Sequence, residues 1–421
     1  MNVMQQPEPT VPDIDRSIQT GIYNKTFSAA ACIASVGSTI FHRSVYGLVS
    51  QPPPVRRSDY NLLFDLGGLT QVLGAGLAAL YLISKNRLDL DIPLDRTIPE
   101  FKHSRFSKIT VSMLLEHCAG FPSSNDLSNY LRKLDNRRPP DKRIIGTSAA
   151  LAELKRVVPQ LKLSFTPGSM VTESAVNSMV LGWIIEAVTG KPLDIFLERE
   201  IFKPLGIADQ IFFVRLYETH HPMLSAKRVF AAGEQCPWRN KLLQGEVSDA
   251  TAWIAGGVAG HAGLFGTIDA VWTIIDALQQ SYHGTGRFFL GGAVKRFWTR
   301  SKRLASATRA LAWDTTTVNN PKAGKRFSQS SVGQVDPLTG AIWIDLASKI
   351  SGVFLANGNH PRATDKIEAI AKIQLRVFEL IAKHGEAILP QINQAMGSKA
   401  FYDSSTQGSV QTSSPYGGRR Y

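Results

Sequence analysis

The chain has 421 residues, of which 43% are hydrophobic, so it is long and apolar enough to bury a sizeable core. Its 47 Lys and Arg residues exceed its 34 Asp and Glu residues, which leaves a net charge of +13. This excess predicts a solvated basic surface rather than a nucleic-acid-binding protein, because no nucleic-acid-binding motif accompanies the charge. Three cysteines give neither a disulfide framework nor the spacing of metal ligands, so we expect no metal and no cofactor.

The beginning of the chain predicts a loose segment followed by a hairpin. Residues 1–14 are polar and contain prolines, which predicts a flexible arm, and residues 15–22 are expected to form a short helix. The first 15 residues hold three acidic residues and no Lys or Arg, unlike a secretory signal, so we expect a cytoplasmic protein. Residues 27–35 and 38–46 are predicted to be two strands joined at Val36-Gly37.

The longest uncharged stretch of this part of the chain runs from Leu66 to Ser84 and holds 19 residues. Apolar or small residues cover every side of its helical projection, which is typical of a helix in a large core or in a membrane. Four glycines lie within the stretch and amphipathic segments flank it on both sides. We therefore predict a buried central helix and expect no transmembrane segment.

The residues that begin this helix carry the first family resemblance. Residues 64–71, FDLGGLTQ, resemble the start of the nucleophile helix in serine β-lactamase-related hydrolases and penicillin-binding proteins, which reads close to F-D-L-A-S-L-T-K. The family's reactive unit is S-x-x-K, in which the lysine takes the proton of a serine on the same helix face. Here the serine position is Gly68 and the lysine position is Gln71. Glycine offers no nucleophile and an amide is not a base, so we expect this pair to be inactive.

Two further segments continue the resemblance in order. Residues 86–93, NRLDLDIP, are similar to the family's G-K-L-D-L-D-D-P turn, and residues 116–122 are similar to the end of its L-L-T-H-T-S-G-L-P phrase. Cys118 follows His117 directly, and adjacent residues on a helix point in different directions. We therefore interpret Cys118 as a structural residue and not as a replacement nucleophile.

A basic segment, residues 125–159, is less similar to the family. It carries six Lys or Arg residues around Pro139-Pro140. One interpretation is a solvated loop, and the other is a docking patch for an anionic polymer or protein partner. The six residues are Arg132, Lys133, Arg137, Arg138, Lys142 and Arg143.

The next block, residues 168–193, contains the position of a second catalytic element. In the family this helix follows a Tyr-Ser-Asn or Tyr-Ser-Asp triplet, and the register places that triplet on Glu173, Ser174 and Ala175. A carboxylate can act as a base if its pKa is raised, but position 68 offers no serine for Glu173 to activate. We therefore favour Glu173 as a carboxylate stabilised at the start of a helix.

The most distinctive similarity covers residues 234–265. The family carries T-E-x-C-P-W-R, G-E-V-H-D-E-N-A and G-G-V-A-G-H-A-G-L-F in this order, and the glycines and aromatic residues remain here. Polar residues do not remain, since Gly233 replaces a threonine and Ser248 replaces a histidine. His261 is retained among small residues, which favours a hydrogen-bonded structural histidine.

The last similar block, residues 309–361, corresponds to the final strands. Where family members carry G-H-T-G-F-T-G-T-S on the strand that lines the active site, residues 333–341 read GQVDPLTGA. The histidine position is Gln334 and a glycine position is Asp336, while Pro337 removes a backbone donor. Residues 367–381 predict an amphipathic helix on the sheet, and residues 386–421 predict a mostly disordered tail.

The resemblance implies an α+β fold of the β-lactamase/transpeptidase type, with an antiparallel sheet flanked by helices. It would occupy residues 15–385, with a mostly helical region over about 86–310. Because the serine, lysine, tyrosine and histidine positions have all changed, we expect a catalytically inactive homologue, a pseudoenzyme with a binding or structural role. Two alternatives stay open: an active hydrolase (esterase, β-lactamase or D-Ala-D-Ala carboxypeptidase-like) with rearranged chemistry, and a basic interaction module.

The same resemblance predicts where a ligand would bind. Gly68 places its backbone N–H at the start of a buried helix, where unpaired donors favour an anion, and Gln71 adds an uncharged donor. Negative charge at Glu173 and Asp336 opposes this. We therefore predict at most a weak site for an anionic small molecule in the former cleft.

Overall fold

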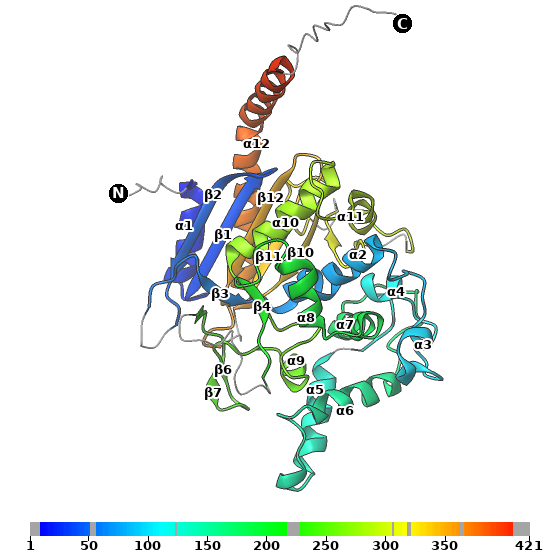
Figure 1. The fold of residues 1–421 in the computed structure, drawn as a ribbon. Helices are drawn as coiled ribbons and strands as arrows, with labels where there is room; N and C mark the ends of the chain where they lie inside the picture. The colour runs from blue at the N-terminus through cyan, green and yellow to red at the C-terminus, as the bar shows by residue number, and fades with distance from the viewer. Residues whose placement is uncertain are drawn as a thin grey trace, which may run out of the picture.

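A six-stranded antiparallel sheet forms the centre of the computed structural model, which describes residues 9–50, 56–122, 124–216, 228–304, 307–317, 321–362 and 366–406 (Figure 1). Helices pack on the sheet and continue beside it as a helical region, so the fold is α+β of the β-lactamase/transpeptidase type, as the sequence predicted. The strand order is β2-β1-β12-β11-β10-β9. The strands are β1 (Ala29–Val36), β2 (Thr39–Gly47), β9 (Asp314–Thr315), β10 (Val332–Asp336), β11 (Gly340–Ile344) and β12 (Ile350–Ala356).

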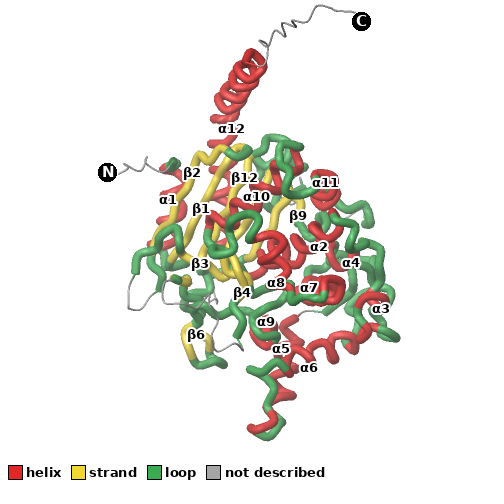
Figure 2. The backbone as a smooth tube through the Cα atoms, viewed as in Figure 1, coloured by secondary structure: helices red, strands yellow, loops and turns green. Residues whose placement is uncertain are grey.

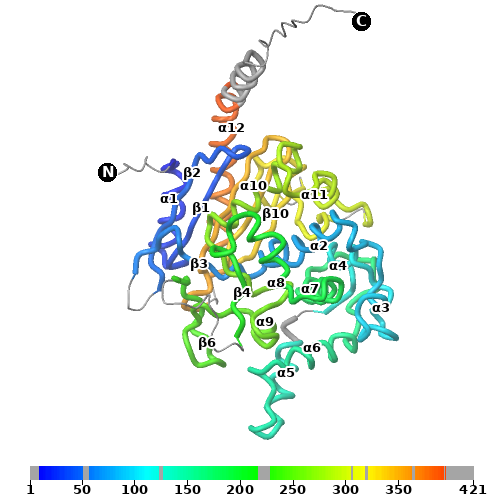
Figure 3. The backbone as a smooth tube through the Cα atoms, in the orientation of Figure 1, coloured from blue at the N-terminus to red at the C-terminus, as the bar shows by residue number. Residues whose placement is uncertain are grey.

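Both ends of the chain build this sheet. Strand β1 forms the predicted hairpin with β2 and pairs on its other side with β12, where Ala31 lies opposite Leu355 (Figure 3). Alternate residues of β1 face opposite sides of the sheet. One side packs against α1 (Pro12–Tyr23) and α12 (Ile367–Thr406), and the other against α10 (Ile268–His283).

The central helix lies at the predicted position but is not uniform. It begins as a 3-10 turn η1 (Gly67–Leu69), continues as a π-helix η2 (Gln71–Ala75) and becomes α-helical only in α2 (Gly76–Ser84). π-helical turns are uncommon and occur often at functional sites. Within the described residues, the stretch from Gly67 to Ser84 is the one helix long and apolar enough to cross a membrane. Because 72% of it is buried inside the fold, its packing is that of a core helix.

The helical region holds short elements around α7, and the chain forms a small second sheet besides the main one (Figure 2). The small sheet has the strand order β4-β8-β3-β5, and β6 pairs with β7 in a separate ribbon. Helix α11 (Gly291–Trp298) packs on α2. The remaining elements are β3 (Leu62–Asp65), α3 (Leu94–Thr97), η3 (Pro99–Phe101), α4 (Val111–Leu115), α5 (Ser124–Asn136), η4 (Pro140–Lys142), α6 (Ala149–Val157), η5 (Val158–Gln160), α7 (Ala175–Thr189), α8 (Leu193–Leu197), η6 (Glu198–Phe202), β4 (Ile211–Phe213), β5 (Val229–Phe230), β6 (Gln235–Cys236), β7 (Lys241–Leu242), α9 (Ala250–Ile254) and β8 (Leu264–Gly266).

The basic segment 125–159, predicted as a loop, is mostly helical. It contains α5, the short η4 turn and α6, and α5 extends away from the body of the protein (Figure 1). Leu127 and Leu131 on α5 and Leu154 on α6 are buried. These few apolar contacts hold both helices, and the many charged residues between them hide the helical pattern in the sequence.

Both termini also differ from the prediction. Helix α1 begins at Pro12, because proline is tolerated in the first turn and Ile14 is fully buried. Residues 12–14 therefore belong to a helix and not to the arm, while residues 1–8 lie outside the described part. Helix α12 continues to Thr406, past the residue 386 at which a disordered tail was predicted, and residues 407–421 lie outside the described part. Ile388 and Leu389 extend its apolar face against the sheet, which explains why the helix continues.

Candidate functional site

A cleft of about 350 Å³ opens beside the start of the central helix. It lies between that helix, the turn that joins β10 to β11, and the segments around residues 234, 248 and 261. The cleft at the family's reactive position is therefore open and not filled by side chains. It is lined by Asp65, Gly67, Gly68, Gln71, Ala175, Glu234, Ser248, Asp249, His261, Ala262, Asp336, Leu338, Thr339 and Asn359.

The family's serine position faces an aspartate across this cleft. The backbone N–H of Gly68 donates a hydrogen bond of 2.8 Å to Oδ2 of Asp336. A Cβ atom placed on Gly68 would lie 2.9 Å from the same oxygen, closer than real Cβ contacts. Gly67 has φ = +47°, and its Cβ would also approach this oxygen to 2.9 Å. Two glycines are therefore required here as long as the Asp336 carboxylate holds its place.

Asp336 is held firmly by the turn that follows it. Its Oδ1 accepts hydrogen bonds from the backbone N–H of Leu338 (2.8 Å) and of Thr339 (2.9 Å). The hydroxyl of Thr339 then donates to the carbonyl oxygen of Leu66 at 3.1 Å, which ties the turn to the start of the central helix. Pro337 lies in this turn, after β10 has ended, so its missing N–H removes no hydrogen bond between strands.

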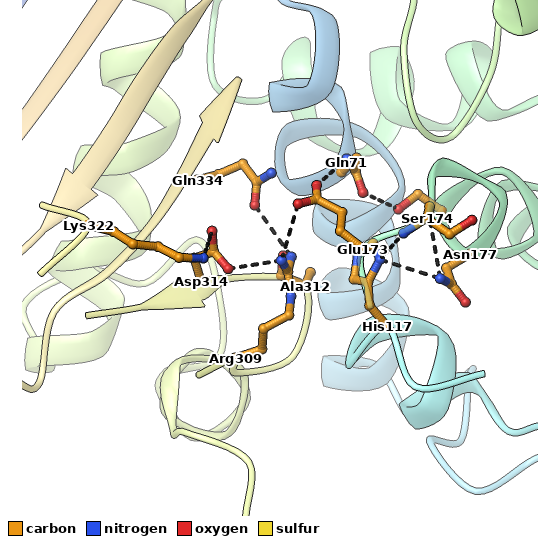
Figure 4. A network of polar contacts seen from close by, with 11 residues as sticks. Gln71, His117, Glu173, Ser174, Asn177, Arg309, Ala312, Asp314, Lys322 and Gln334 are labelled. Carbon is orange, nitrogen blue, oxygen red and sulfur yellow. Dashed lines mark hydrogen bonds and ion pairs between the residues drawn. The ribbon is translucent and has the colours of Figure 1, made fainter. Parts of the chain in front are cut away.

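Gln71, at the family's lysine position, is buried and both ends of its amide are used (Figure 4). Its Nε2 donates to Oε1 of Glu173 at 3.2 Å, and its Oε1 accepts from the hydroxyl of Ser178 at 2.9 Å. Glu173 therefore does contact the former lysine position, as the family register predicts. It does so as a hydrogen-bond acceptor for an amide.

A network of charged side chains supports Glu173 from the opposite side (Figure 4). The second carboxylate oxygen of Glu173 lies 3.8 Å from Nη1 of Arg309, which also pairs with Asp314 at 2.9 Å. Lys322 pairs with the other oxygen of Asp314 at 2.9 Å. Two positive and two negative groups thus neutralise each other, which is what burial of charge requires.

Gln334, at the family's histidine position, belongs to the edge of the same network. Its side chain is fully buried, and its Oε1 lies 3.5 Å from Nη2 of Arg309, at the limit of a hydrogen bond. Its Nε2 has no hydrogen-bond partner among the described residues. Gln334 therefore fills the histidine position without presenting a titratable group.

Ser174 does not offer a free hydroxyl. It is the N-cap of α7, where it accepts from the N–H of Val176 at 3.3 Å, and it donates to the carbonyl oxygen of Pro122 at 2.6 Å. Its own N–H donates to Nδ1 of His117 at 3.2 Å. Burial, with the nearby charge of Arg309, holds the pKa of His117 well below its ordinary value, so this imidazole stays neutral and accepts that bond.

Two other candidates for a replacement nucleophile are also engaged. Cys118 is buried, and burial together with the nearby Glu116 raises its pKa to about 11, so the reactive thiolate is absent at neutral pH. The hydroxyl of Ser248 accepts from Nδ2 of Asn359 at 2.8 Å. Within the part of the chain that the structure describes, Ser248 makes no hydrogen bond to His261, whose Nε2 lies 3.0 Å from Asp249.

Asp65 is a cleft residue whose role the sequence did not reveal. Its carboxylate accepts from the N–H of Gly67 (3.0 Å) and of Ser248 (2.8 Å), and it joins the two sides of the cleft. Burial raises the pKa of this carboxyl, and the negative charge of Asp336 raises it further. The contact between Gly68 and Asp336, by contrast, has one signal in the sequence. Glycine stands at the family's serine position 68, and aspartate stands at a family glycine position, 336.

A protein-family match shows to which family the chain belongs. The model of the family described as Beta-lactamase matches residues 14–375. The chain belongs to the β-lactamase family. The match covers the sheet, the central helix and the helical region, and it ends within α12.

Curated relatives in this family come from Salmonella. A protein of Salmonella agona, whose name refers to D-alanyl-D-alanine carboxypeptidase, is 27% identical over 325 residues, which cover 73% of this chain and 72% of that protein. A protein of the same name from Salmonella typhi is 28% identical over 329 residues, covering 74% of this chain and 73% of its own length.

Solved structures of the same fold are more distant in sequence. EstCE1, a hydrolase with promiscuous acyltransferase activity, superposes with a TM-score of 0.65 at 17% identity and covers 87% of this chain and 97% of its own. A class C β-lactamase superposes with a TM-score of 0.64 at 15% identity, with the same coverage. At this identity the likeness describes the fold alone.

Proposed function

We propose that this member of the β-lactamase family is catalytically inactive and that its cleft serves binding. The observation that carries the proposal is the hydrogen bond between the N–H of Gly68 and the carboxylate of Asp336. That contact places a negative charge beside the residue from which the family's nucleophile would project. It also uses the backbone donor at the start of the central helix.

Acyl transfer through a covalent intermediate requires a nucleophile, a base that activates it and donors for the oxyanion. Gly68 has no side chain, and the amide of Gln71 is not basic. The N–H of Gly68 points at a carboxylate, which would repel the oxyanion of a tetrahedral intermediate. Each of the three requirements is therefore opposed by a specific residue of this chain.

An active hydrolase with rearranged chemistry would need another nucleophile in the cleft. Ser174 caps α7. The hydroxyl of Ser248 accepts from Asn359 and lies beside the Asp65 carboxylate, which is already engaged by the N–H groups of Gly67 and Ser248. A water activated by Glu173 would compete with the hydrogen bond from Gln71 and the charge of Arg309. These contacts favour the inactive interpretation over the active one.

The prediction of a weak anionic ligand at Gly68 and Gln71 remains a prediction. An anion that binds the N–H of Gly68 would first have to displace the carboxylate of Asp336. Gln71 has one of its two Nε2 N–H donors bonded to Glu173, and that carboxylate would repel an anion approaching the other donor. Both contacts argue that such binding would be weak.

Turnover assays test the proposal. Purified protein is expected to hydrolyse a chromogenic β-lactam and a p-nitrophenyl ester no faster than buffer does. A class C β-lactamase serves as the positive control for both assays. A rate above buffer that disappears in the Glu173→Gln variant would contradict the proposal, because it would show that the cleft still performs general-base chemistry.

A second proposed role is docking of an anionic polymer or protein on α5, η4 and α6. The supporting observation is a set of exposed cations in and beside α5 and η4, for which no ion pair is found within the described residues. Helix α5 extends from the body (Figure 1). Elution from heparin at lower salt in the Lys142→Glu, Arg143→Glu variant would support the role, with Lys102→Glu, Arg105→Glu as the control. Equal elution of the two variants would contradict it. The exposed cations are Lys133, Arg137, Lys142 and Arg143.

A further inference from the structure

The cleft beside Gly68 carries a charge opposite to that of the whole chain. The chain has a net charge of +13, yet the cleft is lined by four carboxylates and by no Lys or Arg side chain. Within the described residues, none of the four forms an ion pair with a Lys or Arg. The four are Asp65, Glu234, Asp249 and Asp336.

The carboxylates are held in place by backbone N–H groups instead of by cations. Asp65 accepts from Gly67 and Ser248, and Asp336 accepts from the N–H groups at positions 68, 338 and 339. Asp249 accepts from Ala252 at 2.7 Å. Such bonds fix the positions of the oxygens without a Lys or Arg side chain, and His261 is the one titratable side chain paired with any of these three within the described residues.

Glu234 is different, since it is half-buried at the cleft and no hydrogen-bond partner is found for its side chain within the described residues. It is the carboxylate with the most freedom to meet a ligand. Because its substitution disturbs no described contact, it is also the residue best suited to a test.

A second observation points to a ligand in the same cleft. His261 lines the cleft and is only 2% exposed. Its Nε2 lies 3.0 Å from Asp249, whereas its Nδ1 has no hydrogen-bond partner in the described part of the chain. Buried polar atoms of this kind are rarely left unsatisfied. With Nε2 donating to Asp249, Nδ1 carries a lone pair that would accept a hydrogen bond from a ligand N–H.

The geometry favours an organic cation over a metal ion. No group of three His, Cys, Asp or Glu residues among those described is close enough to hold a metal. Four carboxylates line one cleft of about 350 Å³ instead. A ligand with two positive groups can therefore form charge contacts with more than one of them.

We propose that the cleft binds an organic cation with two ammonium groups, such as a linear diamine. This inference rests on the proposed function, in which the cleft is a binding site without turnover, and it adds the chemical class of the ligand. The ammonium groups would pair with carboxylates that line the cleft. Since the surface of the chain is basic and repels cations, amine binding would report on this acidic cleft.

Calorimetric titration of the full chain with three probes that have the same number of carbon atoms tests the proposal. The probes are cadaverine, a linear diamine; n-pentylamine, with one ammonium group; and glutarate, with two carboxylates. Cadaverine is expected to bind at least about threefold more tightly than n-pentylamine, because n-pentylamine lacks the second ammonium group and so loses one charge contact. Glutarate is expected to give no saturable heat.

One variant and one control place the binding in the cleft. Glu234→Gln is expected to weaken cadaverine binding by about three- to tenfold, the range for loss of one partly buried charge contact. Glu100→Gln, an exposed position in η3 away from the cleft, should leave it unchanged.

The inference is overturned if cadaverine does not bind, if glutarate binds more tightly than cadaverine, or if Glu234→Gln has no larger effect than Glu100→Gln. None of these results bears on the absence of turnover. Conversely, β-lactam or ester hydrolysis would contradict the proposed function while leaving the titration to decide the ligand class. The two failures are therefore distinguishable.

Discussion

The contact between position 68 and Asp336 leads to a double-mutant prediction. In Gly68→Ser, the new Cβ lies 2.9 Å from Oδ2 of Asp336, so the carboxylate must move and lose its 2.8 Å bond to the N–H of residue 68. A hydrogen bond to a charged group contributes about 1.5–3 kcal/mol. The better helix propensity of serine relative to glycine offsets roughly 0.5 kcal/mol of this loss. We therefore expect Gly68→Ser to lower the free energy of unfolding by about 1–2.5 kcal/mol.

In the Asp336→Ala background the Gly68→Ser substitution should leave the free energy of unfolding almost unchanged. The bond is already absent there, and the remaining Cβ of residue 336 would lie 3.7 Å from the new Cβ, which is an ordinary contact. Urea unfolding of the wild type, both single variants and the double variant measures this coupling. Gly292→Ser, where a Cβ meets no atom within 4 Å, is the control and should be near neutral in both backgrounds. Additivity of the two changes within about 0.5 kcal/mol would refute the reasoning.

Three further predictions concern pH, turnover and backbone strain. Burial lowers the pKa of His42 to about 4, and its Nδ1 accepts from the N–H of Val11 at 3.0 Å, so protonation favours the unfolded state. His42 should account for about 2 kcal/mol of the stability lost between pH 7 and pH 5, so the loss measured by urea unfolding should be smaller in His42→Asn. Gly68→Ser with Gln71→Lys should restore no esterase activity, because the carboxylates opposite the pair remain; a rate approaching that of an active relative would show otherwise. Lys25→Gly should raise stability by about 0.5–1 kcal/mol, since this exposed lysine has φ = +57°, and a lower melting temperature would contradict that.

Much of the fold could be predicted from local patterns. The junction at Val36-Gly37 between residues 27–35 and 38–46 sufficed to predict the β1–β2 hairpin, and the uncharged stretch from residue 66 predicted the core helix. The resemblance implied an antiparallel sheet, but the pairing of β1 with β12 was not predicted, because nothing local joins residues more than 300 positions apart. Helices α5 and α6 were missed because they bury only a few leucines under many charges.

The site was predictable residue by residue but not as an arrangement. Motif positions identified Gly68, Gln71, Glu173 and Gln334 as changed catalytic positions. That the Asp336 carboxylate would sit on the N–H of Gly68 depends on a contact between residues 268 positions apart. The same holds for the pairing of Glu173 with a buried arginine, which local sequence does not encode. Spatial proximity, not chemistry, was the missing information.

The central claim is that the cleft forms no covalent acyl intermediate, and intact-protein mass spectrometry tests it most directly. The full chain is incubated with excess penicillin, denatured and weighed, with a class C β-lactamase trapped in parallel as the positive control. The absence of a nucleophile at Gly68 predicts an unchanged mass. A penicilloyl adduct that survives denaturation and maps to a residue lining the cleft would contradict the account.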